Sequence, residues 1–195
     1  ILDFTRTTFH SITQGLMHEN MKELRHATQA IDDEKSLWKR YRRKEILGMR
    51  KIDYLLAVEK NTWFHLGCNS ITQIIYGLKR MLEPCVEHVD NNFKPLPQDY
   101  VDEFIPVCND VDRFLEEARR MIVDGDFSRS DELLVEGNAI KSCISQNRHA
   151  QQTRIQCEDS NIKIALLYLS TLQETQEIIS ITRHLVRASK RFQLQ

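Results

Sequence analysis

Acidic side chains are the groups in this sequence whose number and spacing could most readily do chemistry. Several carboxylates that face one another inside a helical bundle can bind Mg²⁺, Mn²⁺ or iron. The opposing interpretation is a solvated helix face, where acidic residues are common. We therefore predict no metal site, and the weak candidates that remain are Asp110, Glu117, Glu174 and Glu177.

Other metal and catalytic motifs are incomplete. A di-iron bundle needs two Glu-x-x-His pairs and two further glutamates, and the sequence offers one such pair, Glu23 with His26. Cys85 and His88 supply half of a zinc site, and no second pair follows at the spacing of a zinc finger. The sequence contains no GxSxG, P-loop or GxGxxG motif. We therefore predict a protein that is not an enzyme and that needs no cofactor.

A run of cations is the second candidate for a functional surface. Every position from 39 to 44 is basic except Tyr41, and Trp38 comes directly before the run. Such a cluster could contact anionic lipid headgroups or another phosphate-rich partner. A helix that extends beyond its neighbours, with its charges in water, would give the same pattern. Both interpretations stay open for these cations, which are Lys39, Arg40, Arg42, Arg43 and Lys44.

The overall composition is typical of an α-helical protein. Among 195 residues, 41% are apolar and 28% are charged, with 6 glycines and 4 prolines. Few helix breakers and many Leu, Ile, Lys, Glu, Gln and Arg residues favour long helices. The net charge of −1 provides no global field that would attract nucleic acid, so we expect no such partner. The 5 cysteines are scattered without a CxxC pair, which is typical of reduced cysteines in a cytosolic protein.

Apolar residues recur with a spacing near 3.6 along the whole chain, so we predict an all-α protein. We expect the second helix to bury a stripe that includes Ile31, Leu37 and Tyr41, and we expect Asn61 to cap the third helix. Pro95 and Pro97 indicate a linker near the middle of the chain. The predicted helices cover residues 2–17, 20–58, 61–90, 98–123, 128–155 and 161–192.

A short repeat links the two halves of the chain. Residues 72–75 (Thr-Gln-Ile-Ile) return as residues 175–178 (Thr-Gln-Glu-Ile), and the apolar and basic positions that follow match with the same separation. That separation also aligns Leu37 with Ile140 and Tyr41 with Ile144 on the second and fifth helices. Internal repeats of this kind indicate duplication. The matched positions that follow each segment are Leu78, Arg80 and Leu82 in the first half and Ile181, Arg183 and Leu185 in the second.

The repeat and the helix order together predict the architecture. We expect two pseudo-repeated antiparallel three-helix units with long helices, packed together as one domain. Residues 1–93 would form the first unit, residues 94–97 the linker, and residues 98–195 the second unit.

Two stretches of the chain resemble a known family. Residues 87–92 (Glu-His-Val-Asp-Asn-Asn), shortly before Lys94, resemble a segment in the C-terminal part of bacterial inorganic phosphate permeases of the PiT family. That region is similar to the PhoU regulators of phosphate uptake, which are all-α proteins made of two three-helix repeats. The final predicted helix looks like the closing helix of the same region over residues 166–169, 174–175, 185–188 and 191–192.

The resemblance implies a PhoU-like domain at the cytoplasmic face of the bacterial inner membrane, as part of an inorganic phosphate transporter. It implies action by protein interaction, with the membrane part of the permease as a partner and with self-association, and not by catalysis. PhoU regulators bind metal clusters through two acids four residues apart on the third helix of each repeat. Here Glu174 is followed by Ile178, and the matching residues of the first half are Ile71 and Ile75. The resemblance therefore does not extend to metal binding.

Two alternatives to this interpretation stay open. One is a free-standing, metal-binding regulator of the PhoU type that uses the acidic candidates. The other is a helical adaptor for a lipid surface that uses the basic run, with anionic headgroups as its partner. The residues encoded before Ile1 would help to choose, because several spans of about 20 apolar residues there would indicate a membrane transporter.

Overall fold

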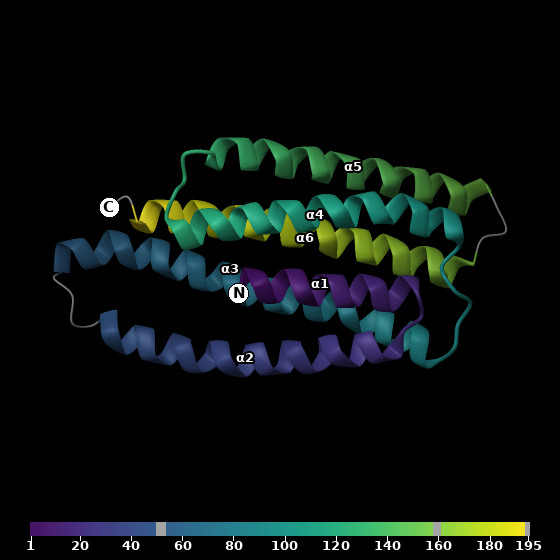
Figure 1. Ribbon diagram of the computed structural model, residues 1–195, viewed down its shortest axis with the longest axis horizontal. Helices are drawn as coiled ribbons and strands as arrows, with labels where there is room; N and C mark the ends of the chain where they lie inside the picture. The colour runs from purple at the N-terminus through teal and green to yellow at the C-terminus, as the bar shows by residue number, and fades with distance from the viewer. Residues whose placement is uncertain (50–53, 158–160, 194–195) are drawn as a thin grey trace.

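A computed structural model describes residues 1–49, 54–157 and 161–193, with the backbone alone at 45–49, 54–60 and 157. These described residues form six α-helices and no strand, which confirms the all-α prediction (Figure 1). The helices are α1 (Leu2–Met17), α2 (Met21–Met49), α3 (Tyr54–Asp90), α4 (Gln98–Asp124), α5 (Ser130–Cys157) and α6 (Ile162–Gln193).

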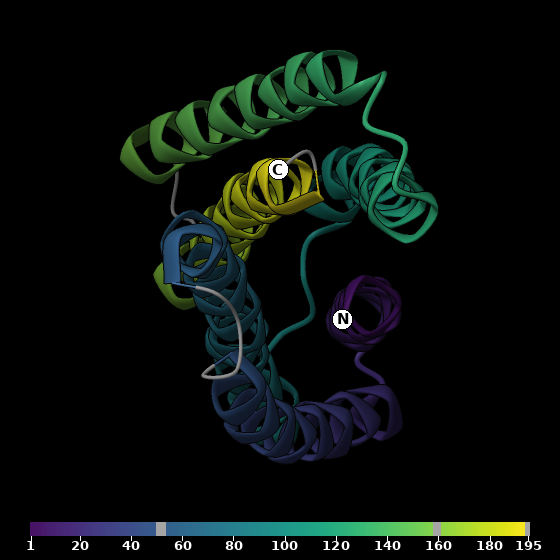
Figure 2. The same cartoon turned by 90° about the vertical axis from the view of Figure 1, so that its left-hand side faces the viewer.

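The helices lie along a common long axis in an inner group and two outer positions. Seen from one end, α1, α3, α4 and α6 form the inner group, with α2 on one outer side and α5 on the opposite side (Figure 2). Within each half of the chain, every helix contacts the other two. Between the halves, α1 contacts α4, and α3 contacts α6 more extensively than any other pair in the described part of the chain.

The core lies where the inner helices face one another. Ile12 of α1, Leu78 of α3, Phe104 and Phe114 of α4, and Tyr168 of α6 are all fully buried. Each of these helices presents one apolar stripe to the others, as the spacing near 3.6 predicts. Burying an aliphatic or aromatic side chain of this size stabilises the fold by about 1.5–3 kcal/mol. The inner four helices therefore supply most of the apolar stabilisation.

Local sequence signals explain where several helices begin and end. The side-chain oxygen of Asn20 accepts a hydrogen bond from the backbone N–H of Lys22, which caps the start of α2. Asn161 caps α6 in the same way through the N–H of Lys163. Gly125 follows α4 with a φ of 68°, a left-handed conformation that glycine adopts without strain.

The junction of α2 and α3 differs from the prediction. Helix α3 begins at Tyr54, so Val58 lies inside α3 and Asn61 is not its N-cap. The residues from Tyr54 to Lys60 include several good helix formers, which outweigh the weak preference of Asn61 for a helix end. Residues 50–53, which the prediction placed inside the second helix, lie outside the described residues.

The predicted core stripe of α2 is wrong at Leu37 and Tyr41, and its later positions lie outside the residues whose side chains the structure describes. Ile31 is buried, but Leu37 is 38% exposed and Tyr41 is 53% exposed. Their matched positions in α5, Ile140 and Ile144, are both buried. Apolar spacing alone does not decide burial, because a stripe is buried only where another helix packs over it.

Candidate functional site

The two repeated segments lie on α3 and α6, close to the point where these helices pack together. The two helices run antiparallel, so that Gly67 lies against Ala188 and Gly77 lies against Ile178. A Cβ atom at Gly77 would lie 3.7 Å from Cγ1 of Ile178. Ile75, the residue that matches Ile178, is buried as well. We call this contact, formed by Ile75, Gly77, Arg80, Glu174 and Ile178, the α3–α6 seam.

Glu174, the first acidic candidate, lies at the edge of the α3–α6 seam. Its two carboxylate oxygens accept hydrogen bonds from Nε and Nη2 of Arg80 at 3.0 and 2.9 Å. The hydrogen bonds from the Glu174 carboxylate raise the pKa of the Arg80 guanidinium. The carboxylate is thus engaged by a cation from the other half of the chain, which satisfies its charge without a metal ion.

The other acidic candidates also have partners of their own. Glu177 accepts a hydrogen bond from the amide of Gln173 at 3.0 Å, one turn away on α6. On α4, Asp110 pairs with Arg113 at 2.6 Å. Glu117 lies 3.3 Å from Arg129, which precedes α5. Within the described ranges, no three His, Cys, Asp or Glu residues gather in a group that could hold a metal ion.

The basic run lies on the part of α2 that extends beyond α1. Its five cations, Lys39, Arg40, Arg42, Arg43 and Lys44, are all exposed, and none forms an ion pair with another residue that the structure describes. Trp38 is half-buried beside them, and its Nε1 donates a hydrogen bond of 3.0 Å to Oγ1 of Thr72 on α3. Trp38 therefore anchors this part of α2 to α3, while the cations remain in solvent.

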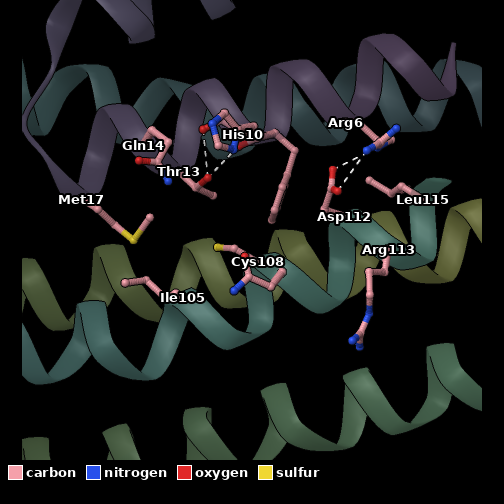
Figure 3. A pocket seen from close by; sticks show the side chains of 12 residues that line it. Arg6, His10, Thr13, Gln14, Met17, Ile105, Cys108, Asp112, Arg113 and Leu115 are labelled. Carbon is pink, nitrogen blue, oxygen red and sulfur yellow. Dashed lines mark hydrogen bonds and ion pairs between the residues drawn. The ribbon is translucent and has the colours of Figure 1, made fainter.

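A polar cavity of about 530 Å³ lies between α1 and α4. Figure 3 shows Arg6 and Asp112 at one end of this cavity and Met17 and Ile105 at the other. The Arg6 guanidinium donates two hydrogen bonds of 3.0 Å to the Asp112 carboxylate. The charge of Arg6 is therefore already neutralised, which makes the cavity a weak site for an anionic ligand.

The Cys108 thiol and the Glu116 carboxylate, at and beside this cavity, are placed to stabilise the fold rather than to act as nucleophiles. Burial raises the pKa of the Cys108 thiol to about 12, so the thiol stays protonated at neutral pH. Next to the cavity, Glu116 accepts hydrogen bonds from Arg119 and Arg120, and it also pairs with Arg6. These contacts lower the pKa of Glu116 to about 2. The result is an ion-pair cluster that fastens α1 to α4.

Sequence reasoning missed a group of aromatic residues at one end of the bundle. An apolar groove of about 320 Å³ lies there, and we call it the aromatic groove after the rings that line it. Trp63 and Phe64 lie in residues 61–78, a stretch without charged side chains that gives no signal of an exposed site. Five ring-bearing side chains define the groove: Trp38 and Tyr41 of α2, Trp63 and Phe64 of α3, and Phe192 of α6.

Comparison with known proteins does not assign this chain to a family. Among the described residues, none of the helices combines the length and the hydrophobicity that are needed to cross a lipid bilayer. The chain matches no protein-family model, and no curated protein is significantly similar to it.

Proposed function

We propose that this chain is a helical interaction domain of the PhoU-like type, built from two related three-helix units. In this proposal it serves as the regulatory and assembly part of an inorganic phosphate transporter, at the cytoplasmic face of the bacterial inner membrane. It acts by binding the membrane part of that transporter and by self-association, and not by catalysis.

The observation that carries the proposal is the pattern of contacts between helices. Each contact within the first half has a counterpart within the second, since α1–α2, α2–α3 and α1–α3 correspond to α4–α5, α5–α6 and α4–α6. The two contacts between the halves, α1–α4 and α3–α6, each join a helix to its own counterpart. A two-fold relation between two similar units would produce this pattern, and it supports a duplicated origin.

The position of the repeated segments supports the same relation. In an antiparallel pair of helices related by a two-fold axis, matched positions face one another at a single point. On α3 and α6 that point lies close to Gly77 and Ile178. Ile178 is the last residue of the matched segment 175–178, and Gly77 lies two residues after the matched segment 72–75. The sequence repeat and the helix packing thus indicate the same centre.

The segment that resembles phosphate permeases has a structural role that fits such a domain. Residues 87–92 end α3, where the side-chain amide of Asn91 donates a hydrogen bond of 2.7 Å to the carbonyl oxygen of Glu87. Asn92 has a φ of 50°, a left-handed conformation that asparagine tolerates better than most residues. This segment turns the chain from the first unit toward the second, so its likeness supports a shared architecture.

Phosphate uptake by the intact gene product tests the proposal. Cells that depend on this protein for phosphate would express either the full protein or a version that lacks residues 1–195 of this chain. We expect the shortened version to insert into the membrane and to show altered uptake or altered response to phosphate supply. The matched control is a full-length protein that carries Lys22→Glu and Arg25→Glu. Both residues are exposed and form no ion pair with a described residue, so this variant should behave as the unchanged protein.

Two results would contradict the proposal. One is unchanged uptake, regulation and assembly after removal of the domain. The other is a gene product with no membrane-spanning segments outside this chain, because the domain would then have no transporter to regulate in the same protein.

A further inference from the structure

The last turns of α6 carry cations along one face of the helix. Arg183, Arg187, Lys190 and Arg191 follow one another at helical spacing, so their side chains lie close together. Like charges at this spacing repel and destabilise a helix. Burial, together with the charge of Arg187, lowers the pKa of the Arg183 guanidinium. This face of α6 therefore carries positive charge that the surrounding helices do not neutralise.

Arginines on other helices of the bundle are neutralised by carboxylates. Each arginine of α1, α3 and α4 forms an ion pair with an Asp or Glu side chain. By contrast, Arg187, Lys190 and Arg191 form no ion pair with any side chain that the structure describes. The negative end of the α6 dipole favours cations here, but it does not explain why they converge on one recess.

The three cations line a recess of about 550 Å³ between α3 and α5. Helix α6 packs against both of these helices, which do not pack against each other in the described part of the chain, so α6 forms the floor (Figure 2). The Lys190 ammonium donates a hydrogen bond of 2.7 Å to Oγ of the buried Ser130 on α5. This contact holds one cation in place at the α5 side of the recess.

The same recess has an apolar wall. Trp63 of α3, Leu134 of α5 and Val186 of α6 line it beside the cations. The Arg191 guanidinium lies over the Trp63 ring at 6.0 Å from its centroid. Indole rings and planar guanidinium groups both stack on planar ligands such as nucleic acid bases. The recess therefore offers cationic contacts and a stacking surface to a single ligand.

Charge and volume together define the class of ligand. Three cations line the recess against one carboxylate, that of Asp131, which leaves two positive charges without a counter-charge. A phosphomonoester carries about 1.5 to 2 negative charges at neutral pH, and arginine donates paired hydrogen bonds to phosphate oxygens. The volume of about 550 Å³ lies in the range of pockets for small organic molecules, and one inorganic ion would leave most of it empty.

We propose that this recess binds a small organic phosphomonoester, with the phosphate between Arg187 and Lys190 and a planar organic group against Trp63. A bound molecule would bridge α3 and α5 over α6. This binding site goes beyond the proposed function and does not depend on it, because it follows from the charges and the cavity of this chain alone.

Calorimetric titration of the purified chain with adenosine monophosphate tests the proposal. This probe joins a phosphomonoester to a planar base. We expect one saturable site, and we expect about 0.5 M NaCl to weaken binding, since salt screens the attraction. Adenosine lacks the phosphate and inorganic phosphate lacks the base. Each should bind roughly tenfold or more weakly than the probe, because a hydrogen bond to a charged group and a stacked base each contribute about that factor.

Removal of single cations locates the phosphate. Arg187→Gln removes an exposed cation that has no partner among the described side chains, and it should weaken binding of the probe about tenfold. Adding Lys190→Gln should bring the loss to about 100-fold. The matched control is Lys22→Gln with Arg25→Gln, which removes the same charge at the opposite end of the bundle (Figure 1). It should leave binding within about twofold of the unchanged chain.

Truncation of the stacking surface locates the organic group. Trp63→Leu should weaken binding of adenosine monophosphate at least about fivefold and leave binding of inorganic phosphate unchanged. A general loss of structure would instead weaken both. Circular dichroism of each variant would establish that it remains helical.

Several outcomes would overturn the proposal. The first is no saturable binding of adenosine monophosphate at millimolar concentration. The second is binding of adenosine or of inorganic phosphate that is as tight as binding of the probe. The third is an equal loss of binding in the two variants that each lack two cations. The fourth is displacement of the probe by phosphatidylglycerol vesicles at matched phosphate concentration and ionic strength, which would assign these cations to lipid headgroups.

Discussion

Arg80 of α3 and Glu174 of α6 form a two-pronged ion pair that joins the two halves of the chain. The Nε–Oε1 distance is 3.0 Å and the Nη2–Oε2 distance is 2.9 Å. The pair has no counterpart on the other side of the repeat, because Arg183 matches Arg80 but Ile71 matches Glu174. Burial lowers the pKa of Arg183, and its Nε finds no hydrogen-bond partner among the described residues. The charges at these matched positions therefore differ between the two halves.

The Arg80–Glu174 pair should stabilise the contact between the halves. A double-mutant cycle with Arg80→Gln and Glu174→Gln should give a coupling free energy of about 1 kcal/mol, because the geometry is two-pronged while Arg80 remains about half exposed. Urea unfolding of the four proteins measures it. Raising the salt concentration should reduce the coupling. Additive effects of the two substitutions would contradict a direct interaction.

Gly77 and Gly15 should respond to alanine in opposite directions. A Cβ at Gly77 would make ordinary contacts at 3.7 Å, and alanine favours helices over glycine, so Gly77→Ala should stabilise the fold by about 0.5–1 kcal/mol. A Cβ at Gly15 would lie 2.5 Å from Cδ2 of the buried Leu24. Gly15→Ala should therefore destabilise by about 1–3 kcal/mol. Thermal unfolding measures the stability of both variants. A loss of stability in Gly77→Ala would show that the α3–α6 seam has no room for the added methyl group.

The hydroxyl of Tyr168 should contribute nothing favourable to stability. Its ring is buried and stacks on Tyr100 at a centroid distance of 5.0 Å, but the hydroxyl oxygen finds no hydrogen-bond partner within the described part of the chain. Burial raises the pKa of this hydroxyl. Tyr168→Phe should leave the free energy of unfolding unchanged or raise it by up to about 1 kcal/mol, because an unpaired polar group is removed.

Loss of the whole ring at the same position supplies the comparison. Tyr168→Ala should lower the free energy of unfolding by about 3–5 kcal/mol through the cavity that it leaves. If Tyr168→Phe were as damaging as Tyr168→Ala, the hydroxyl would have a partner after all.

Glu116 should make the attachment of α1 to α4 sensitive to acid. Hydrogen bonds from Arg119 and Arg120 lower its pKa to about 2 in the folded protein, from 4.5 for an ordinary glutamate. A carboxyl group with a lowered folded pKa contributes stability above its unfolded pKa and loses it as the pH falls toward the folded value. Glu116→Gln should therefore have a lower urea midpoint than the unchanged protein at pH 7. This difference should shrink between about pH 4.5 and pH 2, and a difference that stayed constant over this range would contradict the ion-pair role.

Much of the helical layout follows from the sequence because the signals are local. Apolar spacing near 3.6 defines α1 and α6, and Asn161 and Gly125 set a helix start and a helix end through bonds or dihedral angles within a few residues. The exposure of the basic run is also local, since consecutive cations cannot all be buried. The start of α3 was the exception, because Asn61 resembles a cap yet lies inside the helix, which begins at Tyr54.

The candidate sites depended on contacts between residues far apart in the chain. Nothing near Glu174 in the sequence shows that Arg80 will engage its carboxylate, and nothing near Tyr41 shows that this position of α2 will be exposed. The sequence by itself determined the helices, their apolar stripes and the location of the charges, because these depend on neighbours within one or two turns. Only the tertiary structure decided which charges pair and which aromatic rings stay exposed, because both depend on how helices that are separate in the sequence pack against one another.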